Sequence, residues 1–403
     1  MITPSFALDF TSAVLDPRVT FTRSAATATR FNASGYVETV AADTPRFDYN
    51  PLTLVCRGLL IEEARTNLLT YSEAFNTGWP TKTNATVTTP SVANPANGAT
   101  SDSLVENGSF APHQITRVIT LTAVLHTYSV FAKKGIRNWV FVGATNTTGV
   151  GAYFDLENGL VGNVDAGFTA SISPAANGFY RCSITFTAFA PTGWTLIFGG
   201  ASANGTRSYA GSNGSEALYM YGGQLEAGAF ATSYIPTEAS QVTRNADVAT
   251  MTGTNFTSFW NSVQGGTSTQ ATPSTVSGTR PLVQFDDGTA NEIITLRGNT
   301  TNPELYIVDG GTPQAQLDAG TIAANTAYSL TGWWATNDCK ARQDSGAVVT
   351  DTTATIPTVT QMRIGSDGAN YLNGTIATIG YYDSFFGQPI YTRRKNKVFP
   401  SLL

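Results

Sequence analysis

The feature that most constrains this chain is an alternation of period two, in which aromatic and β-branched residues alternate with polar ones in short runs. Residues 126–131 and 179–187 show the alternation, and Asn158-Gly159 and Asn177-Gly178 are turn dipeptides. Such dipeptides supply the positive φ angles that tight hairpins need, while alternation places one face of each strand against a core. No helical period separates the runs. The pattern therefore favours antiparallel sandwiches or jelly rolls over a parallel sheet.

The strand candidates form two series on either side of a Thr-, Asn- and Gly-rich stretch at 239–256. They lie at residues 118–125, 126–131, 139–142, 152–156, 179–187, 195–198 and 218–221, and at residues 282–285, 292–296, 305–308, 328–334 and 375–382. A chain of 403 residues exceeds the roughly 50–250 residues of one domain. We predict an all-β protein with two antiparallel β-sandwich (jelly-roll) domains in tandem, residues 67–240 and 241–403.

Residues 1–66 interrupt their short apolar runs with prolines at positions 4, 17, 45 and 51, so we expect an irregular N-terminal segment. The best helical candidates in the whole chain are Ile61–Leu69 and Ile390–Val398. Neither heptads nor a short repeat is present, so no coiled-coil stalk is expected.

Charge is scarce. The chain has 23 Lys and Arg against 28 Asp and Glu, or 13% of residues, about half of the roughly 25% of an average domain. The net charge of −5 provides no basic field for nucleic acid. No apolar stretch approaches the roughly 18 residues of a membrane span, and residues 1–9 do not resemble a signal peptide. Three distant cysteines predict free thiols, which suit a reducing cytoplasm.

No catalytic constellation is visible, so we expect a protein that is not an enzyme. Asp155 and Glu157 have the i, i+2 spacing that puts two carboxylates on one face of a strand, but they run into the Asn158-Gly159 turn. The chain has only two histidines and lacks a nucleophile elbow, a phosphate-binding loop and a dinucleotide fingerprint. The alternative that remains is a polysaccharide depolymerase that uses Asp155 or Glu157.

Aromatic residues beside strand entries are the most promising ligand-binding groups. Sugars have apolar faces and polar edges, so their binding sites combine exposed rings with amides and charged groups. Arg137, Asn138 and Trp139 stand at the start of a strand, Trp194 has a similar position, and Trp79 lies in a turn. We predict that these five residues bind sugar. For each tryptophan, burial in the core is the alternative.

A structural calcium ion is the one cofactor that we expect, because jelly-roll binding modules often carry such an ion. Carboxylates are the ligands that calcium prefers, and Asp102, Glu106 and Glu226 are the candidate ligands. His113 and His126 are isolated and have no partner at the spacing of a zinc site. We therefore expect no other metal or cofactor.

Several motifs together resemble virion surface fibre and spike proteins of tailed phages, prophages and gene transfer agents. The resemblance covers nearly the whole chain. In the first 240 residues it is carried by residues 29–32, 45–49, 58–69, 72–75, 79, 154–159, 177–182, 223–228 and 232–237. Residues 285–288 and 373–377 look like parts of a laminin-G or concanavalin A-like sandwich. The recurrent motifs themselves look structural, so loop aromatics are better candidates for binding.

The resemblance implies an N-terminal attachment segment (1–66), a carbohydrate-binding-type jelly roll (67–240) and a laminin-G or concanavalin A-like sandwich (241–403). It also implies an adhesin, a head spike or tail fibre, that binds host surface polysaccharide and contacts other virion proteins through its N-terminal segment. Such a protein would be assembled in the bacterial cytoplasm and displayed on the virion surface as a homo-oligomer, a trimer or a pentamer. A purely structural capsid or tail decoration protein is a further alternative. We expect no nucleic-acid partner and no membrane insertion.

Overall fold

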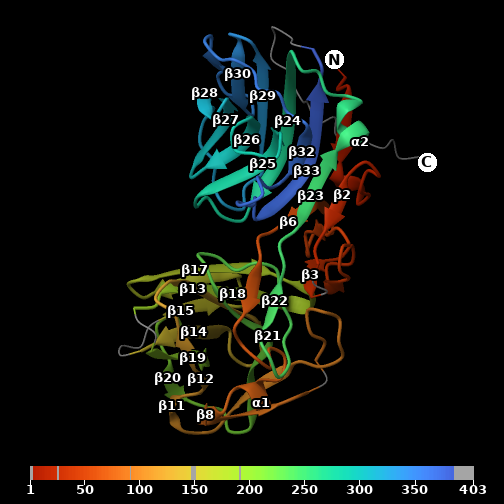
Figure 1. Ribbon diagram of the computed structural model, residues 1–403. Coiled ribbons are helices and arrows are strands. Elements are labelled where there is room, and N and C mark those ends of the chain that lie inside the picture. Colours follow the sequence, from red (N-terminus) through yellow and green to blue (C-terminus); the bar gives the residue numbers. More distant parts are fainter. Residues whose placement is uncertain (1–2, 25–26, 91, 147–150, 190–191, 385–403) are drawn as a thin grey trace, which may run out of the picture.

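Two β-sandwiches stacked end to end make up the molecule (Figure 1). The structure is a computed structural model that describes residues 3–24, 27–90, 92–146, 151–189 and 192–384. The expected all-β fold is confirmed, because the helices in these ranges are four short ones. They are α1 (Phe75–Gly78), α2 (Gly253–Thr257) and the 3₁₀ turns η1 (Phe10–Ser12) and η2 (Ala176–Gly178). None of the described helices has the length and apolar character needed to cross a membrane.

The first sandwich consists of two antiparallel six-stranded sheets. One sheet has the order β17 (Phe168–Pro174), β18 (Tyr180–Thr187), β13 (Leu125–Lys134), β21 (Ser215–Ala227), β10 (Asp102–Glu106) and β9 (Ala85–Thr88). The other has the order β16 (Leu160–Val164), β15 (Gly151–Asp155), β14 (Trp139–Thr145), β19 (Thr192–Ala201), β12 (Gln114–Leu121) and β8 (Thr81–Thr83). A separate pair, β11 (Phe110–Pro112) and β20 (Ser208–Ala210), closes one side.

Alternation along β14 and β15 decides which side chains reach the core of this sandwich. Val140 and Val142 point inward together with Phe154, and all three are fully buried. Trp139 and Phe141 therefore point to the opposite, outer face of the sheet. The turn that ends β15 contains Gly159 with φ of 68°, as the Asn-Gly signal predicts.

The second sandwich pairs an eight-stranded sheet with a seven-stranded sheet. The larger sheet has the order β31 (Val349–Asp351), β30 (Cys339–Gln343), β29 (Tyr328–Ala335), β24 (Gln264–Pro273), β33 (Gly374–Tyr382), β6 (Cys56–Ile61) and β5 (Phe47–Tyr49), with β1 (Phe6–Asp9) also paired to β33. The smaller has the order β2 (Thr20–Thr22), β23 (Val248–Thr252), β32 (Gln361–Ile364), β25 (Thr279–Asp286), β26 (Ile293–Asn299), β27 (Asn302–Asp309) and β28 (Thr312–Asp318).

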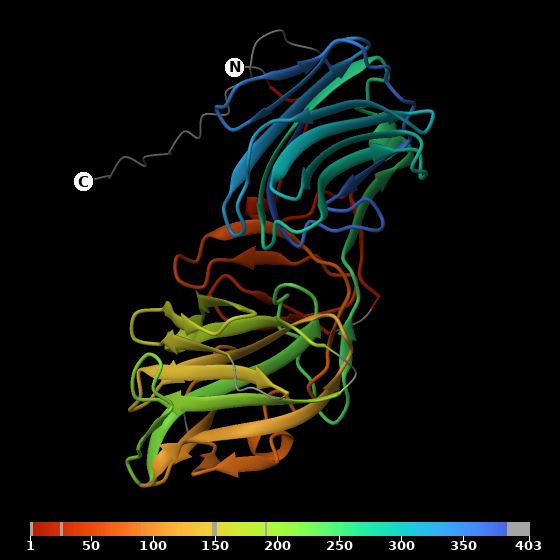
Figure 2. The ribbon, with the colours of Figure 1, turned by 90° about the vertical axis from the view of Figure 1, so that its left-hand side faces the viewer.

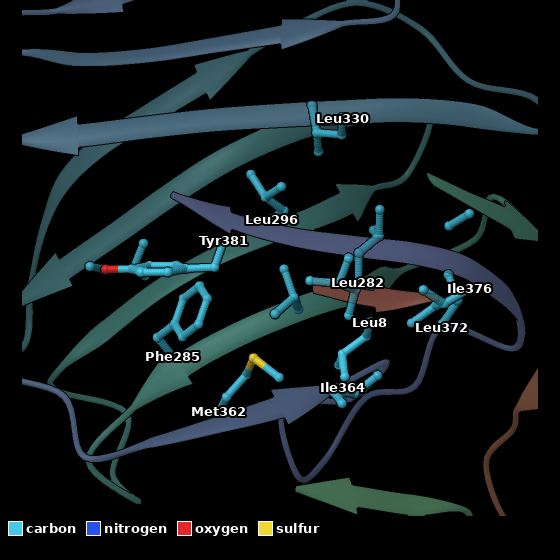
Figure 3. Packing of buried hydrophobic residues seen from close by; sticks show 14 of the residues in the cluster. Leu8, Leu282, Phe285, Leu296, Leu330, Met362, Ile364, Leu372, Ile376 and Tyr381 are labelled. Carbon is cyan, nitrogen blue, oxygen red and sulfur yellow. The ribbon is translucent and has the colours of Figure 1, made fainter. Parts of the chain in front are cut away.

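Residues 1–66 are not the irregular segment that we expected, because their described part supplies strands to both sheets of the second sandwich. Strand β1 pairs with β33 and β2 with β23. Leu8 of β1 is buried beside Leu282 and Ile376 in the core of that sandwich (Figure 3). Pro4 lies before the first strand and the other three prolines lie between strands, so none interrupts a strand. The second sandwich is consequently built from both ends of the described chain.

The predicted helix at Ile61–Leu69 is also wrong. Strand β6 ends at Ile61, and the short strand β7 (Arg65–Asn67) follows it. Gly58, with φ of 110°, brings β6 so close to β33 that a Cβ atom there would lie 2.0 Å from the Ile376 carbonyl oxygen. Sheet pairing therefore overrides the local helical pattern. The other predicted helix, Ile390–Val398, lies outside the described residues.

Two segments carry the chain between the sandwiches, and they pair with each other. Strand β7 leads into the first sandwich, and β22 (Val242–Arg244) leads back to the second, antiparallel to β7 (Figure 1). The hairpin of β3 (Ala28–Phe31) and β4 (Val37–Val40) lies between the two bodies, as the side view also shows (Figure 2). All three cysteines are free thiols; Cys182 and Cys339 are buried, and Cys56 is partly buried.

Candidate functional site

The most promising binding surface is the outer face of the sheet that contains β14. We call it the β14 face and define it by the side chains of Gln114, Trp139, Phe141, Tyr153 and Arg207. Phe141 and Tyr153 are cross-strand partners, and their ring centroids are 5.0 Å apart in an edge-on arrangement. Trp139, one alternation step before Phe141, packs on the same small cluster and remains partly exposed. The cluster thus lies on the opposite side of the sheet from the core.

Glycines let these rings lie close to the sheet. A Cβ atom on Gly162 would come within 2.6 Å of Cζ3 of Trp139, and one on Gly151 within 2.8 Å of Cζ of Phe141. Both distances are shorter than real carbon contacts, so no larger residue fits at either position without moving a ring. Because these glycines have no side chain, the Trp139 and Phe141 rings can lie directly against the sheet.

Two asparagines are joined beside the Trp139 ring. The Asn163 backbone amide donates to Oδ1 of Asn204 at 2.7 Å, and Nδ2 of Asn204 donates to Oδ1 of Asn163 at 3.1 Å. Oδ1 of Asn204 also lies 2.5 Å from the position of a Cβ atom on Gly162, which places the pair next to the indole. Because both side chains are exposed, their remaining donor and acceptor positions are available to a ligand.

Arg207 lies over the other end of the aromatic cluster. Its guanidinium carbon is 4.0 Å from the centroid of the Phe141 ring, and Nη2 donates to Oε1 of Gln114 at 2.7 Å. Burial lowers the pKa of Arg207, while the negative charge of Asp165 and the nearby Tyr153 act in the opposite direction. Burial likewise raises the pKa of the Tyr153 hydroxyl.

Two polar groups of this face form no hydrogen bond to the described protein residues. These are Nε1 of Trp139 and the Tyr153 hydroxyl. Flat rings flanked by open donors and acceptors can stack on the apolar face of a sugar and hydrogen-bond its hydroxyl groups. The β14 face therefore has the groups needed to bind a carbohydrate.

The structure separates the five residues predicted to bind sugar. Trp139 is at the β14 face, and Asn138 is the exposed residue that precedes it in the chain. Arg137 instead turns to the other side, where Nη2 bonds Oε1 of Glu106 at 2.5 Å and the guanidinium stacks on Tyr209. The Arg137 guanidinium is therefore occupied by Glu106 and Tyr209 within the protein.

Trp79 and Trp194 were wrong predictions, because both rings are core residues with 1% and 3% of their surface exposed. Trp79 packs near Tyr128 with centroids 6.0 Å apart, and Trp194 packs on Phe186 at 5.1 Å. Their neighbours along the chain are turn residues, but the tryptophans themselves fill the space between the sheets. Neither can present its ring to a sugar.

The predicted calcium ligands do not form a metal site. Asp102 accepts the Phe75 amide at 2.7 Å, and Glu106 accepts the Tyr209 hydroxyl at 2.9 Å in addition to Arg137. Glu226 accepts the Thr232 amide at 3.0 Å. Each carboxylate is satisfied by hydrogen-bond donors, and no cluster of three His, Cys, Asp or Glu residues suited to a metal occurs in the described part of the chain.

The carboxylate pair that an enzyme would need is tied up in a turn and a surface ion pair. Asp155 accepts the backbone amides of Glu157 and Asn158 and the side-chain amide of Asn158. Burial raises the pKa of Asp155, but these bonds outweigh it and keep the pKa below its ordinary value. Glu157 pairs with Lys134. A general acid needs a raised pKa, so Asp155 is poorly suited to that role.

The recurrent motifs meet at the junction between the sandwiches. Arg46, from the motif at 45–49, forms buried ion pairs with Asp247 and, at 2.8 Å, with Glu62. The Ser233 amide donates to Glu62 at 2.8 Å, and the Thr29 hydroxyl donates to the Tyr234 carbonyl at 2.5 Å. These motifs are separated by up to about 200 residues in sequence but are adjacent in space, which agrees with their interpretation as structural elements.

Electrostatics keep the junction carboxylate Glu62 ionised. Burial alone would raise its pKa, but Arg244 and Arg46 favour the charged form. Together with the hydrogen bonds from Ser233, they lower the pKa of Glu62 to about 2. Burial raises the pKa of the neighbouring Glu226, although Arg181 and Arg65 oppose that shift.

Two hollows lie elsewhere on the molecule. One of about 350 Å³ lies between the two bodies, with residues 34–36, 51–54 and 174–180 along its walls. The other, of about 290 Å³, is lined by residues 84–86, 105–107 and 213–214. Neither hollow contains Trp139.

Four members of the β14 face were missed from the sequence: Gln114, Phe141, Tyr153 and Arg207. Both faces of β14 are apolar, so alternation alone does not show which face is the core. Arg207 comes from the turn after β19, and no local motif links it to Phe141. The one available signal was the row of glycines at 143, 151, 162 and 199, which marks a close approach without naming its partner.

No family model matches the chain, and no curated protein matches it either. Among solved structures, the chain is similar to the mouse laminin alpha1 chain, domains LG4-5. The sequence identity is 8%, the match covers 68% of this chain and 85% of that chain, and the TM-score is 0.24. A similarity this low carries no argument about function, and the sandwich fold rests on the sheet topology described above.

Proposed function

We propose that the protein is a non-enzymatic adhesin that binds host cell-surface polysaccharide through the β14 face. The observation that carries the proposal is the partly exposed Trp139 ring, held on Gly162 beside the Asn163–Asn204 pair. An aromatic surface flanked by amides matches the two kinds of surface that a sugar presents. Asp155, the carboxylate across from Trp139 on the neighbouring strand, is bonded in a turn, which matches binding better than hydrolysis.

The proposal includes display on a phage-like virion, as a head spike or tail fibre. Its support is the resemblance of the junction motifs to virion surface proteins. Because the N-terminal strands belong to the second sandwich, contact with other virion proteins would use the exposed surface of residues 1–66. Val14, Leu52, Leu54 and Val55 are exposed there, with 47–66% of their surface accessible. Copies in a homo-oligomer would raise avidity by roughly 10²–10⁴ without new contacts.

The test compares retention of the purified protein on capsulated and acapsular cells of the same strain. Wild type should bind the capsulated cells more strongly, and Trp139→Ala should reduce that binding by about 5- to 150-fold, because loss of one stacking ring costs roughly 1–3 kcal/mol. Phe110→Ala is the matched control, since Phe110 is a 78% exposed ring that does not belong to the β14 face as defined. It should bind like wild type.

Equal retention on both kinds of cell, or full retention by Trp139→Ala, would contradict the proposal. Release of reducing ends from the capsule, lost in Asp155→Asn or Glu157→Gln, would favour the depolymerase instead. Particles that lack the protein but adsorb normally, while breaking more easily, would favour a purely structural role. An electron micrograph of labelled particles separates head from tail placement.

A further inference from the structure

We propose that the polysaccharide bound at the β14 face is acidic and that Arg207 binds its carboxylate. This inference rests on the proposed function and names the class of glycan. Arg207 is half-buried on the Phe141 ring, and one Nη2 bond to the neutral Gln114 amide is its hydrogen bond within the described residues. A guanidinium has five N–H donors in a planar fork that fits a carboxylate through two parallel bonds.

Five of the six other described arginines that stack on a ring pair with a carboxylate; the sixth, Arg181 on Phe131, instead donates to the Ser129 hydroxyl and the Thr232 carbonyl. Arg137 stacks on Tyr209 at 4.5 Å and pairs with Glu106, and Arg297 stacks on Tyr306 at 3.8 Å and pairs with Glu304. Arg207 has no ion pair within 4.0 Å to any described carboxylate. Its other N–H groups are not among the fully buried unpartnered atoms, so they keep some contact with solvent.

The surrounding charges orient the ligand. Asp165 is close enough to influence Arg207, but its Oδ2 accepts the Gly151 amide at 2.9 Å. Asp155 is the cross-strand neighbour of Trp139, so the Trp139 end of the face carries a negative charge. Phe141 is two residues further along β14, roughly 7 Å away. An acidic sugar would therefore stack its ring near Trp139 and place its carboxylate at Arg207.

The overall charge makes this local contact decisive. A net charge of −5 repels a polyanion at long range, so the protein has no general affinity for acidic polymers. Selectivity for a carboxylate must come from a cation in the site. On the β14 face as defined, Arg207 is the residue that supplies one.

The experiment uses an array of purified bacterial capsular polysaccharides, each printed in its native form and with its carboxyl groups reduced to alcohols. The full chain is applied as wild type, Trp139→Ala, Arg207→Gln, Arg207→Lys and the matched control Arg297→Gln, which removes the same charge from the second sandwich. A thermal unfolding curve accompanies each variant. Arg207→Lys keeps the charge, so it tests recognition even where Arg207→Gln disturbs the turn.

We expect wild type to bind at least one native acidic polysaccharide about tenfold or more tightly than its reduced form, as for a charge-assisted hydrogen bond. Arg207→Gln should lose the same factor, and reduction should then have no further effect. Arg207→Lys should fall between, and Arg297→Gln should match wild type.

Wild-type binding that survives carboxyl reduction would overturn the inference, as would an Arg207→Gln variant that still loses tenfold on reduction. In both cases binding that depends on Trp139 would leave the proposed function standing. Binding that neither Trp139→Ala nor Arg207→Gln reduces, or no binding to any printed polysaccharide, would contradict the proposed function itself.

Discussion

The junction between the sandwiches and the β14 face both contain partly or fully buried polar groups, but they differ in how these groups are satisfied. At the junction, the Arg46 guanidinium is fully enclosed and has two carboxylate partners. On the β14 face, the Arg207 guanidinium stacks on a ring and bonds one neutral amide. We therefore expect the junction to stabilise the fold and the β14 face to bind a ligand.

The difference shows that a recurring motif and a binding site can occupy separate places in one chain. The motifs that the sequence makes most noticeable meet at the junction, where they fix how two bodies connect. The groups left open for a ligand come from ordinary strands and one turn. A change at the junction should therefore alter stability, and a change on the face should alter binding.

The largest effect is expected from Arg46→Met. It leaves Asp247 and Glu62 buried with one partner fewer each, and breaking a buried pair costs about 3–5 kcal/mol. Urea unfolding measures the loss. Lys134→Met is the control, because its ion pair with Glu157 is exposed and worth about 0–1 kcal/mol. If Arg46→Met and Lys134→Met lost the same free energy of unfolding, the buried ion pairs at the junction would stabilise the fold no more than the exposed one.

Acid should weaken the junction through Glu62. Its folded pKa of about 2 lies below its ordinary value, so its stabilising effect is complete above about pH 4.5 and is lost as the pH falls toward 2. The loss is about 3 kcal/mol and is read from unfolding curves across this range. Glu62→Gln should remove that part of the pH dependence.

Glu226→Gln provides the matched control for this pH series. Burial raises the pKa of Glu226, so neutralising it should cost less stability at pH 7 than neutralising Glu62. A Glu226→Gln variant as unstable as Glu62→Gln would show that the two carboxylates do not differ as described.

The smallest effect on stability, with a clear effect on binding, is expected from Gly162→Ala. The added Cβ atom would meet the Trp139 ring at 2.6 Å, so the ring must move off the sheet. We expect several-fold weaker retention on capsulated cells, while the free energy of unfolding changes by less than about 1 kcal/mol. Gly108→Ala is the control, because its Cβ atom would make an ordinary 3.6 Å contact. If Gly162→Ala bound the cells as well as wild type, the position of the Trp139 ring against the sheet would not matter for binding.

The sequence predicted the all-β fold because alternation and turn dipeptides are local signals, as at 179–187 and Asn158-Gly159. It failed for residues 1–66, since the pairing of β1 with β33 joins residues more than 360 positions apart. Of the site, it found Trp139 from its place at a strand entry. Arg207 and Tyr153 join Trp139 only through sheet pairing and a turn, which no local pattern specifies.

Hydroxyl-radical footprinting with the host capsular polysaccharide reports which side chains the ligand covers, and so locates the binding surface. Oxidation of Trp139 and Tyr153 should fall when the polysaccharide is bound, while the exposed Phe110 and Phe189 should react as before. Unchanged oxidation of Trp139, with protection instead of Tyr36 and Tyr180 in the hollow between the two bodies, would contradict binding at the β14 face.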